Sequence, residues 1–376
     1  MPSSPPSDRP SKEEVTALEK YHCAACGAQA EWNARKQALI CGYCGTESPA
    51  ELTSSGLIQE HDLALALRDM PDSWRGWETP KRTVRCRSCE AITVFDAQKV
   101  GKSCDFCGSP ELLDYEEIEA PVRPESLLPF TIGRERVYEI IKTWLDSHWL
   151  APSNLRAKGL VDTTHGVYLP YWTFDSEVDC RWTAESGDYY YVTRSVRDSQ
   201  GNTRQVRERR VRWYPSSGRL QHAFDDHLIP ASRGVEAPHL RKVEPFPTED
   251  LVPYDTGYVT GWDIEHYQVI LLEAAEQAHT EKTNVLTDLA SRRVPGDTHR
   301  NLRVHPKFSR ETFKHILVPV WILTYQYGSQ SFQVVVNAVT GNIAGSHPYC
   351  RKKIALLILA GVIIGMIILW IAATQR

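Results

Sequence analysis

The sequence lacks the short motifs that mark the best-known enzyme classes. It has no phosphate loop of the Walker type, no His-Glu-x-x-His, no Gly-x-Ser-x-Gly and no dinucleotide-binding glycine fingerprint. These absences exclude the enzyme classes that depend on those motifs. We therefore predict that the protein is not an enzyme. The polar residues His165, Asp175 and Asp226 leave one alternative open, an unfamiliar enzymatic site, which a deep polar pocket around them would support.

A strong net charge and an export signal are also missing. The formal net charge is −4, so the chain as a whole carries no signal for binding a polyanion. Residues 1–14 are rich in proline, serine and charged side chains, unlike a signal peptide. Cysteines without an export signal indicate a reducing compartment.

What the chain does have is a duplicated cysteine pattern. Eight of its ten cysteines form two sets of four, and each cysteine of the first set has a counterpart 63 residues later, which identifies an internal repeat. The first set is Cys23, Cys26, Cys41 and Cys44, and the second is Cys86, Cys89, Cys104 and Cys107.

Each set consists of two Cys-x-x-Cys pairs, the spacing of a Cys₄ zinc site. Glycine follows the pair at Gly27, Gly45 and Gly108, while Glu90 takes that place in the fourth turn and predicts a looser one. Disulfides and a redox pair are the alternatives, but nothing marks a secreted protein and the pattern is duplicated. We predict two structural Zn²⁺ ions, because four thiolates leave no open position for catalysis.

The rest of the chain divides by composition and periodicity. We predict small, tandem zinc-ribbon β modules and an α+β domain with two helix-strand-strand units. Helical stripes over 134–150 and 264–289 are each followed by a proline-bearing aromatic strand, with the prolines expected at sheet edges or strand starts. The expected divisions are a leader (1–20), zinc ribbon 1 (21–50), a linker with a helix (51–80), zinc ribbon 2 (81–113), a linker (114–130) and the α+β domain (131–348).

The C-terminal stretch 354–373 is apolar throughout and long enough for a membrane span. Arg351, Lys352 and Lys353 precede it, so the positive-inside rule places the N-terminal domains in the cytoplasm. We expect a C-terminal transmembrane helix, a single-pass location in the cell inner membrane, and the lipid bilayer as a partner.

A hairpin between residues 181 and 219 contains nine arginines and no lysine. It is either a solvated hairpin that protects a sheet edge, or a surface for anionic lipid or nucleic acid. The candidate contact residues for an anion or a nucleic acid are Arg194, Arg197, Arg204, Arg207, Arg209, Arg210 and Arg212.

Together with the cysteines, several strings resemble a bacterial family of TFIIB-type zinc-ribbon proteins, also catalogued as primosomal protein N′ or replication-restart helicase-like. The strings are LPF, GVYLPYWTFD, FDDHLIP, TFKHILVPVWILTYQY and VVVNAVTGNIAG. The resemblance spans most of residues 20–350 and implies zinc at the eight cysteines. It implies no catalytic residue, and no helicase motor, because the nucleotide-binding loop is absent.

Two functions follow as expectations. The first is a membrane tail-anchored zinc-binding adaptor that faces the cytoplasm and recruits protein partners to the inner membrane. The alternative is a nucleic-acid-binding accessory protein that uses the zinc ribbons and the arginine-rich hairpin. Measured DNA or RNA affinity that falls steeply with salt would favour the alternative.

Overall fold

The computed structural model describes residues 23–47, 57–70, 81–96, 104, 106–107, 109–115, 122–152, 164–197, 203–328 and 330–374. The predicted leader, 1–20, lies outside these residues, as do residues 198–202 of the predicted arginine-rich hairpin and most of the linker 51–80.

The fold is dominated by one branched sheet of twelve strands, with a separate two-stranded sheet, β1 (Ala30–Asn33) and β2 (Ala38–Cys41). The central path of the large sheet runs β10-β7-β12-β8-β11-β5-β4-β6. Its strands are β3 (His61–Asp62), β4 (Lys81–Cys86), β5 (Ile92–Asp96), β6 (Leu112–Asp114), β7 (Ser126–Leu127), β8 (Thr164–Arg197), β9 (Thr203–Pro230), β10 (Val252–Pro253), β11 (Asp263–Glu265), β12 (Thr298–Tyr327), β13 (Gln330–Asn337) and β14 (Ile343–Gly345).

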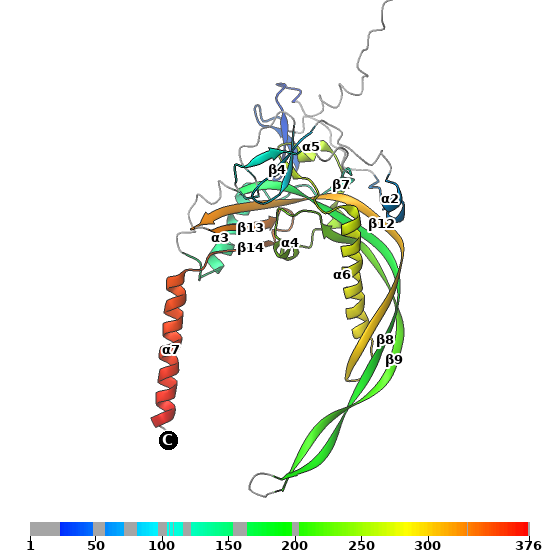
Figure 1. The fold of residues 1–376 in the computed structure, drawn as a ribbon. Helices are drawn as coiled ribbons and strands as arrows, with labels where there is room; N and C mark the ends of the chain where they lie inside the picture. The colour runs from blue at the N-terminus through cyan, green and yellow to red at the C-terminus, as the bar shows by residue number, and fades with distance from the viewer. Residues whose placement is uncertain are drawn as a thin grey trace, which may run out of the picture.

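The described residues also form helices, which are α2 (Leu63–Arg68), α3 (Arg134–Ser147), α4 (Ala237–Val243), α5 (Thr256–Val259), α6 (Leu271–Ser291), α7 (Arg351–Thr374) and the 3₁₀ helix η4 (Thr248–Asp250). Most of them pack against strands, whereas α7 extends away from the sheet in Figure 1. Figure 1 shows α6 lying inside the curve of β8, β9 and β12, while the ends of β8 and β9 project beyond it as an arm.

Strands β8 and β12 pair antiparallel over most of their length, and their alternating side chains build a core on each face. One face carries Tyr168 and Trp321, which pack with α3. The opposite face carries Val167 and Val318, which pack with α4. Because both faces are covered, these strands read as nearly continuous apolar runs rather than as alternating ones.

Pro170 and Pro319, the prolines of the two predicted aromatic strands, are not at sheet edges, so that expectation was wrong. Pro170 and Pro319 each lie in a central strand, at a point where the neighbouring strand changes. The carbonyl of Pro170 accepts from Ala231 and that of Pro319 accepts from Ala338. A missing N–H is tolerated where one neighbour ends and the next begins, because no ladder bond is required there.

The long strands bend where three irregularities meet. A register shift interrupts β8 at Asp175, Asp226 in β9 has φ 47°, and Arg310 in β12 has φ 52° beside a second register shift. The N–H of Asp226 donates to the Asp175 carboxylate over 2.6 Å, and the Lys314 ammonium lies 2.7 Å from the Asp226 carboxylate. Bulges bend strands and increase their twist, so these positions account for the arch seen in Figure 1.

The first of the two predicted helical stripes agrees with the structure better than the second. In α3, which forms within the first predicted stripe, Val137, Ile141 and Leu145 are buried. The second helix, α6, begins at Leu271, because the preceding residues form β11 and a connection. Within α6 the apolar residue Val285 is exposed, whereas the charged residue Lys282 is buried.

The predicted fold class needs correction in two respects. The domain is mostly β rather than α+β, because three very long strands supply most of its structure. The second zinc ribbon is not a separate module, because its strands β4, β5 and β6 belong to the large sheet, and β5 pairs with β11.

The predicted transmembrane helix is also corrected. In the part of the chain that the structure describes, no helix is long and apolar enough to cross a membrane. Helix α7 does form over the predicted stretch. The predicted inner-membrane location depended on a transmembrane helix, so this prediction is contradicted as well.

Candidate metal centres

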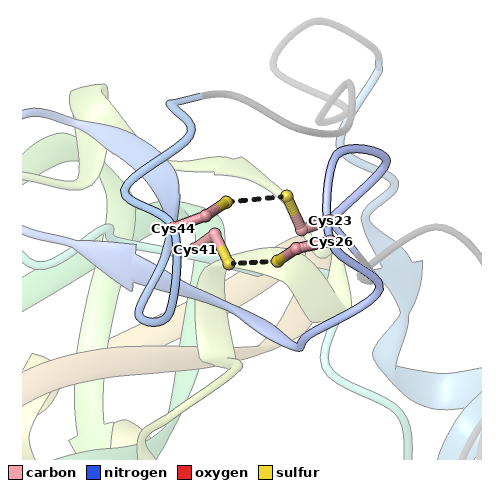
Figure 2. Close-up of side chains that lie close together, drawn as sticks. All are labelled: Cys23, Cys26, Cys41 and Cys44. Atoms are coloured by element: carbon pink, nitrogen blue, oxygen red, sulfur yellow. Dashed lines mark hydrogen bonds between the residues drawn. The ribbon is translucent and has the colours of Figure 1, made fainter.

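The first cysteine set converges at one end of the β1–β2 ribbon (Figure 2). The sulfurs of Cys23 and Cys44 lie 3.5 Å apart, and those of Cys26 and Cys41 lie 3.4 Å apart. All four sulfurs lie within 4.8 Å of one another. Cys23 and Cys41 are buried, whereas Cys26 and Cys44 are exposed.

The second set repeats this geometry. The sulfurs of Cys86 and Cys107 are 3.5 Å apart and those of Cys89 and Cys104 are 3.6 Å apart, again with all four within 4.8 Å. In this set Cys86 and Cys104 are buried and the other two are half-buried. The repeat in the sequence is therefore a repeat in space.

The distances fit a metal site and not disulfides. A disulfide joins its sulfurs at about 2.05 Å, far shorter than any pair here. A tetrahedral zinc with Zn–S of about 2.3 Å places its sulfurs about 3.8 Å apart, close to the observed separations. The two Cys₄ clusters are thus compatible with two structural zinc ions, and the prediction of two zinc ions as cofactors is confirmed.

Three of the turns that carry the sulfurs, those ending at Gly27, Gly45 and Glu90, share one backbone conformation. Gly27 and Gly45 have φ of 72°, and their N–H groups donate to the carbonyls of Cys23 and Cys41. Glu90 replaces glycine in the second set, yet it adopts φ 62° and its N–H donates to Cys86 over 3.0 Å. The turn at Glu90 therefore closes as those at Gly27 and Gly45 do, and the looser turn expected there is not observed.

Within the first cluster the thiols oppose one another's ionisation. The hydrogen bond from the Thr46 hydroxyl lowers the pKa of Cys44 to about 6. Although a backbone hydrogen bond from Ala28 acts in the opposite direction, the Cys41 and Cys44 thiols raise the pKa of Cys26 to about 12. One thiolate thus forms at the expense of its neighbours.

The second cluster shows the same division. A hydrogen bond from Cys89 lowers the pKa of Cys104 to about 5, whereas burial raises the pKa of Cys107 to about 12. A bound divalent cation removes this opposition, because its charge favours all four thiolates at once. The donor set in each cluster is therefore suited to hold zinc.

The first ribbon docks through its strands, with its sulfurs directed away from the core. The indole N–H of Trp32 donates to the carbonyl of Phe130 over 3.2 Å, and its ring meets Tyr258 edge-on. The Gln37 amide donates to the same carbonyl over 2.8 Å. At the zinc end Tyr43, between the last two cysteines of the set, is 86% exposed.

The second ribbon docks through its sulfur-bearing end. Cys86 and Cys104 belong to the core on the α4 face of the sheet, together with Phe106. Phe106 is the counterpart of Tyr43 in the repeat but is only 1% exposed. Its carbonyl accepts from the Gln333 amide over 3.2 Å and from the Thr324 hydroxyl.

The arginine-rich hairpin forms the distal arm, which we define as residues 188–197 of β8 and 203–213 of β9. Strand β12 pairs with β8 only up to Gly187, so beyond this residue the arm is a two-stranded ribbon. All seven candidate arginines lie on the arm and are exposed. The sequence therefore located this charged surface correctly, while its binding role remains a prediction.

The residues considered for an enzymatic site do not come together. Asp175 and Asp226 meet at the bend, with Lys314 and Glu60 beside them. His165 lies near the start of β8, about ten residues from Asp175 and hence roughly 33 Å away along the strand. The structure does not join these three residues into one site.

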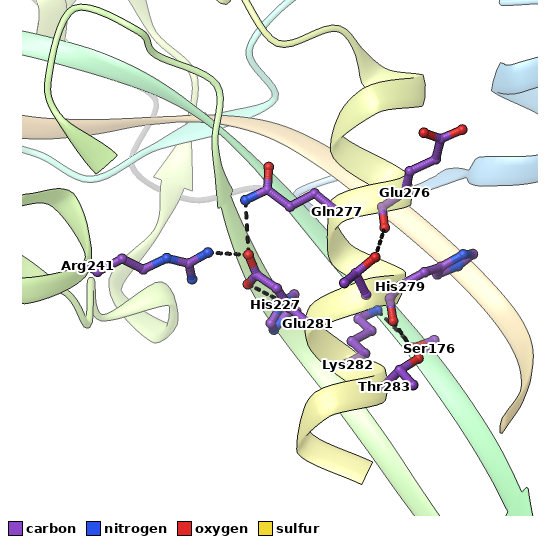
Figure 3. Close-up of polar contacts among 10 residues, drawn as sticks. Ser176, His227, Arg241, Glu276, Gln277, His279, Glu281, Lys282 and Thr283 are labelled. Carbon is purple, nitrogen blue, oxygen red and sulfur yellow. Dashed lines mark hydrogen bonds and ion pairs between the residues drawn. The ribbon is translucent and has the colours of Figure 1, made fainter. Parts of the chain in front are cut away.

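A polar network that the sequence did not indicate connects α6 with the sheet (Figure 3). The carboxylate of Glu281 pairs with His227 at 3.3 Å and with Arg241. The ammonium of Lys282 donates to the Ser176 hydroxyl over 2.9 Å. Burial lowers the pKa of Lys282 to about 8. A lysine on an otherwise small and apolar helix face was the only signal in the sequence.

Comparisons with known proteins add one relative. The chain is 23% identical over 346 residues to the uncharacterized protein YdjG of Bacillus subtilis (strain 168), covering 89% of this chain and 92% of that protein. No protein-family profile matches the chain. No solved structure matches it.

These comparisons limit the family resemblance inferred from the sequence. The Cys₄ clusters suggest zinc-ribbon-like modules. The narrower assignment, to TFIIB-type or primosomal protein N′-like proteins, gains no support from the relative or from a family profile.

Proposed function

We propose that the protein is a zinc-binding adaptor that recruits a protein partner through the exposed zinc end of its first ribbon. Four thiolates close each zinc coordination sphere, so the ions serve to shape a surface and not to bind a substrate. An adaptor needs a rigid surface that its own chain leaves uncovered.

The repeat supplies the observation that carries this proposal. Tyr43 and Phe106 occupy equivalent positions between two zinc ligands. Phe106 is buried against its own sheet, whereas Tyr43 is 86% exposed. The second ribbon thus demonstrates how this end packs on a protein surface, and the first ribbon presents the same end to solvent.

The contacts of Phe106 describe the chemistry of a suitable partner. A Cβ on Gly234 would lie 2.7 Å from the Phe106 ring, so only glycine allows this close approach. Side-chain donors from Thr324 and Gln333 bind the Phe106 carbonyl. A partner of Tyr43 should likewise offer an apolar recess lined by a small residue, with hydroxyl or amide donors at its rim.

Site-specific photocrosslinking in cells tests the proposal. Benzoylphenylalanine at position 43 of the full chain should yield a discrete protein adduct, and the crosslinked peptide should come from a surface of the chemistry described. The same probe at Leu65, which is 50% exposed on α2, is the control. Tyr43→Ala should retain about two zinc ions per chain and lose the partner. A partner that Tyr43→Ala retains, or adducts that are the same from both positions, would refute the proposal.

A further inference from the structure

One face of the distal arm combines arginines with aromatic rings and carries no carboxylate among its described residues. Cross-strand partners share a face, and the register of β8 with β9 is regular throughout the arm. This face, which we call the arginine–tyrosine face, comprises Tyr189, Tyr191, Thr193, Ser195, Arg197, Thr203, Gln205, Arg207, Arg209, Val211 and Trp213.

The opposite face of the arm is of mixed charge. It carries Arg194, Arg204 and Arg210, but also Glu208, which pairs with Arg210 at 3.3 Å. Asp188 lies on this face as well, across from Arg212. The arginine–tyrosine face therefore carries arginines and no carboxylate among its described residues, whereas the opposite face carries charges of both signs.

Two arginines of that face, Arg207 and Arg209, each lie over a tyrosine ring of the same face. The guanidinium of Arg207 lies 4.0 Å from the ring centre of Tyr191, and that of Arg209 lies 4.3 Å from the ring centre of Tyr189. At the root of the arm, Arg300 lies 4.2 Å from the Trp213 ring. Stacking uses the flat side of a guanidinium and leaves its in-plane N–H groups directed outward, where they suit phosphate oxygens.

We infer that the arginine–tyrosine face of the distal arm binds the phosphate backbone of double-stranded DNA. A two-stranded ribbon fits the major groove of B-form DNA, which is about 12 Å wide. The deep, narrow major groove of an RNA duplex does not admit such a ribbon. Single strands are bound largely by stacking of bases on aromatic rings, but here Arg207 and Arg209 cover the rings.

The shape of the arm distinguishes DNA from a lipid surface. Two-stranded ribbons twist strongly, so the cationic face turns around the axis of the arm along its length. A charged face that twists around the axis of the arm can stay in contact with a helical DNA groove over a longer distance than with a flat bilayer. This site is independent of the Tyr43 surface, which lies on a different part of the chain.

Fluorescence anisotropy with the full chain and a labelled 20-base-pair DNA duplex tests the inference. Binding should be measurable at about 50 mM salt and weaken steeply with added salt. Arg207→Gln with Arg209→Gln should weaken binding at least about tenfold and reduce the salt slope by about 2, since each phosphate contact contributes nearly one unit.

Arg194→Gln with Arg204→Gln is the matched control, because it removes the same charge from the opposite face. It should change the affinity less than about threefold. Equal losses in both double variants would overturn the inference, as would tighter binding of a single strand of the same length. Binding to vesicles containing phosphatidylglycerol but not to the duplex would overturn it in favour of a membrane surface.

Discussion

The two zinc ribbons have the same cysteine spacing and the same metal geometry, yet they are attached to the sheet in opposite ways. The second presents its sulfur-bearing end to the α4 face, where Cys86 and Phe106 are part of the core. The first packs on the α3 face through Trp32, and its zinc end points outward. The comparison teaches that one module can serve as part of a core or as an exposed surface, depending on which end it buries.

The largest difference should appear when zinc is lost from the second ribbon. Cys89→Ser should remove that ion and with it much of the roughly 10–16 kcal/mol that a structural zinc supplies. Because β5 of this ribbon pairs with β11 in the large sheet, the loss should lower the main unfolding temperature by more than about 10 °C. Calorimetry together with metal analysis measures both effects. An unchanged main transition with one zinc lost would contradict the assigned role.

Cys26→Ser in the first ribbon should have a more local effect. The zinc content should fall from about two to about one per chain, but the main transition should shift by only about 2–4 °C, since Trp32 and its ribbon contribute a smaller part of the core. The same calorimetric scan measures this. If Cys26→Ser and Cys89→Ser lower the transition equally, the proposed contrast between the ribbons does not hold.

Glycine substitutions probe the contrast without touching a ligand. A Cβ at Gly234 would meet the Phe106 ring at 2.7 Å and the Glu265 carboxylate at 2.8 Å. Gly234→Ala should therefore destabilise the protein by roughly 1–3 kcal/mol through overpacking. Gly42→Ala, at the zinc end of the first ribbon, meets nothing within 4 Å and should stay within about 0.5 kcal/mol. Urea unfolding of the two variants should separate them, and equal effects would count against the docking described for Phe106.

Lys282→Met should have a modest effect that involves neither zinc. Burial lowers the pKa of Lys282 to about 8, so between pH 8 and about 10.5 the native state releases a proton that the unfolded state retains. Wild-type stability should therefore rise with pH in that window, and below pH 8 the cost of the buried charge is present.

Removing the amine should abolish this rise and increase the free energy of unfolding at pH 7 by about 1–2 kcal/mol. The loss of the hydrogen bond to Ser176 should offset part of this gain. Chemical denaturation across the pH range checks this, with zinc content constant at about two. A wild-type rise that persists in Lys282→Met would assign it to another group. Because Lys282 touches neither cluster, a change in the main unfolding transition of this variant at constant zinc content would show that the transition reports unfolding of the sheet and not loss of metal.

The sequence indicated the metal centres well because their chemistry is local. Two residues between cysteines fix two sulfurs on one turn, and the 63-residue repeat supplied the second site without knowledge of the fold. The left-handed turn at Glu90 was less predictable, since one hydrogen bond, from its own N–H to the Cys86 carbonyl, accompanies a conformation that glutamate seldom adopts.

Long-range features were beyond reach of the sequence patterns. Strands as long as β8 were interpreted as several short elements, because residues buried on both faces show no alternation. The bend at Asp175 arises only when three distant segments align. Likewise, Phe106 is buried because it contacts Gly234, Thr324 and Gln333, which are far from it in the chain, and its difference in exposure from Tyr43 therefore depends on distant residues.

The most direct test of the contrast between the ribbons is the release of zinc to a strong chelator, followed together with far-ultraviolet circular dichroism. We expect two phases of about one ion each. The first should leave the spectrum almost unchanged, because Cys26 and Cys44 are exposed, and the second should coincide with loss of sheet signal. Release of both ions in one phase, or fewer than about two ions per chain, would contradict the account.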